Sequence, residues 1–105
     1  MPNFLEETLN NLAKNNKTIQ DVKWVGFTHE KGNVELVLQE GWPEFNFEYD
    51  DDYGHAEIPL SLVIVGDNWW MERGEYDGSE WWEFKTVLDK PIYRLTPKMN
   101  ILELK

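Results

Sequence analysis

The sequence predicts an α+β fold, with one N-terminal helix packed on an antiparallel sheet of five or six strands that includes a Trp-rich hairpin. Three observations lead to this prediction. Residues 3–15 carry an apolar stripe at helical spacing, several later segments are rich in β-branched and aromatic residues, and residues 68–85 hold four of the six tryptophans. A chain of 105 residues, 41% apolar, is expected to form a single domain (1–105) with a real core.

Residues 3–15 have the pattern of an amphipathic helix. Asn3 is a good N-cap, and Glu6 follows three residues later in a capping-box pattern. Asn15 and Asn16 tolerate the left-handed geometry of a helix end. We expect one stripe to face the core: Phe4, Leu5, Leu9, Leu12 and Ala13.

Residues 22–28 and 34–39 are expected to form a β-hairpin around Lys31–Asn33. A shift of two residues leaves the facing of the side chains unchanged, so one face is well defined whichever turn forms. Its members are Val25, Phe27, Val34, Leu36 and Leu38. Trp24 and Val37 are expected on the other face.

The next segments are less regular. Phe45, Phe47 and Tyr49 alternate with polar residues, which favours a half-buried strand, while a short helix beginning at Pro43 is the alternative. Residues 50–55 are expected to form a loop.

Residues 58–65 are apolar on both faces apart from Ser61, which is typical of a central strand, with Pro59 near its start. Residues 92–95 and 99–104 are expected to add short strands.

The block at 68–85 predicts a hairpin of two Trp-Trp strands joined at Asp77-Gly78, a type I′ turn. On one face the predicted pairs are Met71 with Phe84, Arg73 with Trp82 and Glu75 with Glu80. On the other face they are Trp70 with Lys85, Glu72 with Glu83 and Gly74 with Trp81.

Two of these pairs, Glu72–Glu83 and Glu75–Glu80, place like charges opposite each other, which is unfavourable. A local rule broken without structural gain indicates function, unless an error in the turn geometry creates the clash. The carboxylates and two indoles form the candidate partner-binding set: Asp50, Asp51, Asp52, Glu72, Glu75, Asp77, Glu80, Glu83, Trp69 and Trp81. Trp is enriched at binding hot spots, although most indoles of a small domain are core residues.

Charge is unevenly distributed along the chain. The net charge is −10, and residues 40–89 contain fourteen acids against two bases, a net charge of −12. Such a surface repels phosphates and anionic membranes, so we expect no direct nucleic-acid or membrane binding. A basic protein surface is the expected partner, with ordinary solubility as the alternative explanation.

The sequence lacks the motifs of several functional classes. The chain has no cysteine, which excludes disulfides and thiolate metal sites, and only two histidines. Residues 50–57 do not match EF-hand spacing, and no phosphate loop or nucleophile system is present. We expect no catalytic residues, metal or cofactor. The acidic N-terminus is unlike a signal peptide, which favours a cytoplasmic location.

The stretch 65–91 resembles small uncharacterised proteins encoded by phages and prophages. The residues that carry the resemblance are Gly66-Asp67-Asn68-Trp69-Trp70-Met71-Glu72-Arg73 and Glu75-Tyr76-Asp77-Gly78-Ser79-Glu80-Trp81-Trp82-Glu83-Phe84. The resemblance implies a phage accessory protein in the host cytoplasm that binds and disables a host protein. Anti-CRISPR and anti-restriction proteins that imitate DNA are similar in charge and size.

The expected function is therefore non-enzymatic inhibition of a host protein, such as a nuclease, through its basic nucleic-acid-binding surface. The first alternative is an immunity- or antitoxin-like protein that neutralises one toxin. The second is a carbohydrate- or peptide-binding module that uses the hairpin tryptophans. Either a monomer or a small homo-oligomer is compatible with the sequence.

Overall fold

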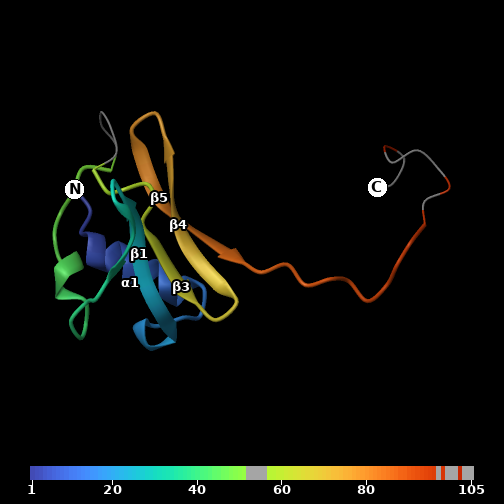
Figure 1. Ribbon diagram of the computed structural model, residues 1–105. Coiled ribbons are helices and arrows are strands. Elements are labelled where there is room, and N and C mark those ends of the chain that lie inside the picture. Colours follow the sequence, from blue (N-terminus) through green and yellow to red (C-terminus); the bar gives the residue numbers. More distant parts are fainter. Residues whose placement is uncertain (52–56, 97, 99–101, 103–105) are drawn as a thin grey trace.

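A computed structural model of the protein describes residues 1–51, 57–96, 98 and 102 and has one α-helix and a five-stranded antiparallel sheet (Figure 1). The sheet order is β2-β1-β3-β4-β5. The elements are α1 (Phe4–Lys14), η1 (Ile19–Asp21), β1 (Val22–His29), β2 (Gly32–Leu36), η2 (Pro43–Phe45), β3 (Val63–Gly66), β4 (Trp69–Tyr76) and β5 (Ser79–Thr86), where η marks a 3₁₀ turn. The predicted α+β fold is confirmed.

Helix α1 begins and ends as predicted, but its buried stripe differs. The Asn3 side chain accepts a hydrogen bond from the Glu6 amide at 3.0 Å, and Asn16 adopts a left-handed φ of 60°. The buried residues of α1 are Phe4, Thr8 and Leu12, whereas Leu9 and Ala13 are exposed. Thr8 takes the central place because its hydroxyl donates to the Phe4 carbonyl and accepts from the Trp82 indole.

No helix in the described part of the chain is long and apolar enough to cross a membrane.

The β1–β2 hairpin has the predicted inner face but a different turn. Val25 pairs with Leu36 and Phe27 with Val34, so these side chains share one face as expected. The strands meet at His29 and Gly32, which places the turn at residues 30–31 rather than around residue 32. Gly32 is the first residue of β2 and has a positive φ of 116°, a backbone conformation that glycine adopts without strain.

Residues 45–49 do not form the predicted strand. The alternative is correct, because Pro43 starts the 3₁₀ turn η2 directly after Trp42, which has a left-handed φ of 57°. The segment that follows is held against the N-terminus instead of a strand, since the Phe4 amide donates to the Phe47 carbonyl and the Tyr49 amide to the Pro2 carbonyl. Phe45 and Tyr49 still reach the core.

The predicted strand at 58–65 is central in the sheet but shorter. Only Val63–Gly66 forms β3, between β1 and β4. Residues 59–62 turn instead, with the Leu62 amide bonded to the Pro59 carbonyl at 3.1 Å. Ile58 and Leu62 are nevertheless buried in the core.

Residues 87–96 form no strand, contrary to the prediction for 92–95, and we call them the C-terminal arm. The arm begins where the Val87 amide donates to the Asn68 carbonyl at 3.1 Å, and it then leads away from the sheet (Figure 1). The predicted strand at 99–104 lies outside the described residues except for Leu102.

Candidate functional site

The β4–β5 hairpin has the predicted register throughout. Met71 pairs with Phe84, Arg73 with Trp82, and Glu75 with Glu80 on the face that packs against α1. Asp77 and Gly78 both have positive φ, 51° and 89°, as a type I′ turn requires. The two like-charge pairs are therefore real features of the structure.

Glu80 does not lie on the surface. Its residue is only 3% exposed, and its carboxylate accepts from Arg73 Nη2 at 3.0 Å. It also accepts from the backbone amides of Glu57 at 2.9 Å and Ile58 at 3.3 Å. These three donors hold the carboxylate inside the protein, where a partner cannot reach it, so Glu80 is not part of a partner-binding surface.

Arg73 is the centre of this buried cluster. Its guanidinium donates to Glu7 Oε1 at 3.1 Å, to the Tyr49 hydroxyl at 3.1 Å and to Glu80. It also lies 4.8 Å from the ring centroid of Trp82 and 5.2 Å from that of Phe4. Cation–π contacts of this kind are strongest away from water, and they replace part of the lost hydration.

The electrostatics of the cluster follow from burial and hydrogen bonding. Burial raises the pKa of Tyr49, and the hydrogen bond to Glu7 raises it further. Burial alone would lower the pKa of Arg73, but the hydrogen bonds to Tyr49, Glu7 and Glu80 outweigh that effect and raise it. Arg73 Nε is buried and has no hydrogen-bond partner among the residues that the structure describes. The cluster thus places one guanidinium between two carboxylates and the Tyr49 hydroxyl, and one guanidinium donor stays unmatched among the described residues.

The second like-charge pair, Glu72–Glu83, lies on the opposite face and is also accounted for. Lys85 Nζ is 3.8 Å from Glu72 Oε1 and 3.8 Å from Glu83 Oε1, so one ammonium group lies between both carboxylates. The Trp81 indole also donates to Glu83 at 3.1 Å. Both like-charge pairs therefore have basic partners that stabilise them. The expectation that they bring no structural gain is wrong, so the pairs themselves do not indicate function.

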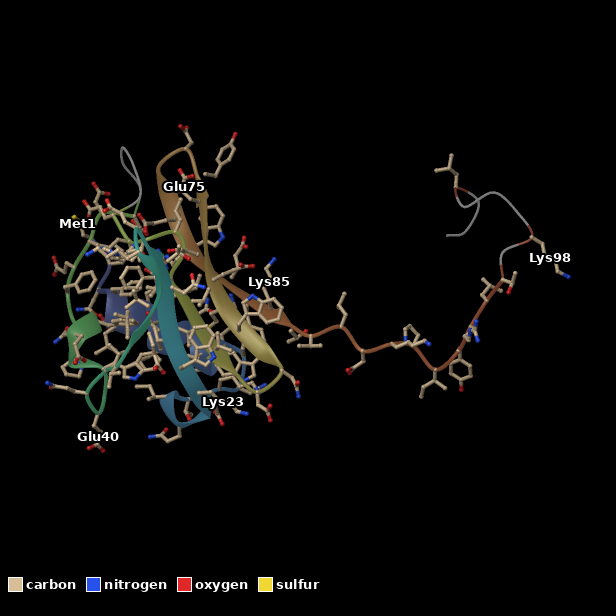
Figure 2. The ribbon with its side chains drawn as sticks, viewed as in Figure 1. Met1, Lys23, Glu40, Glu75, Lys85 and Lys98 are labelled. Atoms are coloured by element: carbon tan, nitrogen blue, oxygen red, sulfur yellow. The ribbon has the colours of Figure 1, made fainter. Side chains whose placement is uncertain are left out.

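The remaining carboxylates gather at the tip of the hairpin. Glu75 and Asp77 lie at the turn, where Glu75 Oε1 accepts from the Gly78 amide at 3.1 Å (Figure 2). Residues 50 and 51, at the start of the acidic loop, lie at the same end, because the Glu80 amide donates to the Asp51 carbonyl at 2.9 Å. We define the acidic end as Asp50, Asp51, Glu57, Glu75 and Asp77. Asp52 lies outside the described residues.

Glu57 belongs to the acidic end although the sequence did not single it out. Its carboxylate accepts from the Asp50 amide at 3.1 Å, which joins the two described edges of the loop. The signal available in the sequence was its place five residues after the acidic run Asp50–Asp52. Only the contact with Glu80 shows that it returns to the hairpin tip.

The tryptophans divide between the two faces of the sheet. Trp69 is buried, stacked on Phe84 at 5.4 Å, so its predicted role at a partner surface is incompatible with its position. Trp82 is buried as well, whereas Trp81 is 38% exposed on the outer face, where its ring covers Gly74.

No protein-family model, no curated protein and no solved structure matches this chain. The fold and the site therefore define a class only: an α+β domain whose hairpin tip carries an acidic end.

Proposed function

We propose that the protein is a non-enzymatic binding protein whose acidic end contacts a basic surface on another protein. The observation that carries this proposal is the arrangement of carboxylates around the hairpin tip. Within the described residues no Lys or Arg forms an ion pair with Asp51, Glu57, Glu75 or Asp77, whereas Glu72, Glu80 and Glu83 each lie within 4 Å of a basic group. Negative charge left uncompensated at one end attracts a positive partner and speeds its association.

In its more specific form, the partner surface is one that ordinarily binds nucleic acid, such as that of a host nuclease, and the carboxylates take the place of phosphates. The resemblance of residues 65–91 to phage and prophage proteins supports this form. A rigid scaffold also supports it, because residues 51 and 57 are hydrogen-bonded to Glu80, which is itself fixed by Arg73. These bonds fix the backbone that carries the carboxylates, and a fixed backbone reduces the conformational entropy lost on binding.

The test is capture of proteins from bacterial lysate by the tagged chain, washed at low and at high salt. Capture of a nucleic-acid-binding protein at low salt, its loss at high salt and its displacement by duplex DNA are the expected results. The variant Glu57→Lys/Glu75→Lys/Asp77→Lys should weaken capture about tenfold or more. Glu80 is left unchanged because its reversal would break the core.

A matched control changes the same charge elsewhere. Glu30→Lys/Glu35→Lys/Glu40→Lys alters three exposed acids of the β1–β2 region and should leave capture nearly unchanged. If both variants lose capture equally, the acidic end acts only through the net charge of the protein and is not a specific binding site. Salt-resistant capture of one protein that DNA does not displace would instead favour the antitoxin-like alternative.

A further inference from the structure

The outer face of the sheet carries an aromatic surface that no described helix covers. Register places one set of apolar side chains on this side, opposite Met71 and Trp82, and we call it the tryptophan face: Trp24, Val63, Val65, Trp70 and Trp81. Trp24 is 44% exposed. Side chains of this size gathered on one open face are typical of an interaction surface.

Two glycines make the tryptophan face flat. A Cβ at Gly26 would lie 3.0 Å from the Trp24 ring, and one at Gly74 would lie 2.5 Å from Trp81 Nε1. Each indole therefore lies down over the bare backbone of a glycine instead of standing up from the sheet. The result is a shallow surface suited to an extended segment rather than to a protruding side chain.

The C-terminal arm is a second exposed apolar feature. Leu88, Ile92 and Tyr93 are each more than 90% exposed, and Leu95 is 76% exposed. The long axis of the molecule is 55 Å against 33 and 32 Å, and the radius of gyration is 17.7 Å, where a compact chain of this length has about 13 Å. Apolar groups held so far from the body are without the burial that normally stabilises them.

Charge separates the arm from the rest of the chain. The arm contains two bases and one acid, whereas residues 1–86 contain eighteen acids and six bases. The tryptophan face is bordered by Glu35, Glu72 and Glu83, with Lys85 as the basic residue among them. The arm and this face are thus complementary in both polarity and charge.

The direction of the arm points to another molecule. The Val87 amide is bonded to the Asn68 carbonyl in the β3–β4 turn, and the chain beyond it extends away from the body (Figure 2). Lys90 precedes Pro91, which favours extended backbone there and disfavours a tight reversal.

We propose that the C-terminal arm of one copy docks on the tryptophan face of a second copy, in a reciprocal dimer. In a two-fold dimer each arm binds the face of the other copy, so two equivalent contacts form. The dimer therefore buries twice the area of one arm-to-face contact, which brings it closer to the area of a stable interface. The two acidic bodies repel each other, and a basic arm between them offsets that repulsion. This dimer uses neither Glu75 nor Asp77, so its test is independent of the test of the proposed function.

The test is the molar mass of the full chain in solution, measured by light scattering over a range of concentrations. The wild-type protein should reach twice its 12.5 kDa. Leu88→Asp/Ile92→Asp in the arm and Trp24→Lys on the face should each remain monomeric. Leu60→Asp, an exposed apolar position in the 59–62 turn, is the control and should dimerise normally.

Mixing the two monomeric variants gives the decisive measurement. The Trp24→Lys protein keeps an intact arm and the arm variant keeps an intact face, so the mixture should regain dimers with one working contact. Circular dichroism of each variant checks that it is folded, and a second face variant, Trp70→Lys, covers the case in which Trp24→Lys is not. A wild-type monomer at every concentration would overturn the proposal, as would dimers that persist in both variants.

Discussion

Arg73 is a cation enclosed by aromatic rings and two carboxylates, with its side chain fully buried. Removing charge from water is costly, and the cost is offset only where every partner is in place. Here the partners come from the helix, the segment after η2 and the neighbouring strand, as Glu7, Tyr49 and Glu80. The buried pair thus depends on contacts that are distant in sequence.

Arg73→Met should lower the free energy of unfolding by about 3–5 kcal/mol, because Glu80 would be left as a buried charge without a cation. Urea denaturation of the purified variant measures this loss. Lys23→Met is the control, since Lys23 forms a solvent-exposed ion pair with Asp67 at 3.4 Å. It should change stability by less than about 0.5 kcal/mol, and a similarly small loss for Arg73→Met would contradict the role of the cluster.

Tyr49 should make the fold sensitive to alkaline pH. Its pKa is raised in the folded state by burial, so the native protein keeps the proton while the unfolded chain loses it above about pH 10. The stabilisation is therefore complete below that pH and declines as pH rises, by at most about 1.4 kcal/mol per pH unit.

Tyr49→Phe should flatten this alkaline decline, at the cost of about 1–2 kcal/mol at neutral pH from the lost hydrogen bonds. Denaturation series at several pH values give both quantities. Tyr76→Phe is the matched control, because Tyr76 is 77% exposed and its ring remains in water. An unchanged decline in Tyr49→Phe would show that other groups control the alkaline behaviour.

At the scale of elements, the Trp hairpin could be predicted in detail while the segments before it could not. Asp77-Gly78 fixes the turn, and the turn fixes every pair along both strands. Residues 45–49 and 58–62 gave strand-like patterns because their apolar residues are buried. Their backbones, however, are held by Pro2, Phe4 and a proline turn rather than by sheet neighbours.

The candidate site was predictable only in part, for the same reason. Glu75 and Asp77 follow from the local turn, whereas the burial of Glu80 depends on Arg73 and on the amides of residues 57 and 58. One signal was present in the predicted register. Glu80 was placed on the same face as Met71 and Trp82, which is the core face, and that argued for burial.

Two glycines beneath indoles give a comparison within the sheet. A Cβ at Gly66 would lie 2.1 Å from the ring of Trp69, which is buried and cannot move aside. Gly66→Ala should therefore cost about 1–3 kcal/mol. Gly74→Ala meets the half-exposed Trp81, which can swing into solvent, and should cost less. Thermal denaturation of both variants tests the order, and a larger loss for Gly74→Ala would contradict it.

At the scale of the whole molecule, the sheet and helix form a dense body from which the C-terminal arm extends. Trypsin should cut after Arg94 before it cuts within the body, because the arm residues are exposed and outside the sheet. Mass spectrometry of the fragments over time measures this order. If arms are exchanged between copies, cleavage at Arg94 should slow as protein concentration rises, and a rate independent of concentration would contradict that exchange.

The Glu80 carboxylate also has a consequence for folding. It joins β4 through Arg73 and the loop edge through the amides of residues 57 and 58, while Arg73 joins the helix through Glu7. If any one of these elements unfolds, the charged side chains of the others remain buried but lose their hydrogen-bond partners. Partly folded forms are thereby penalised, and we expect a single cooperative transition in which hydrogen exchange at α1, β4 and β5 proceeds with one common opening free energy.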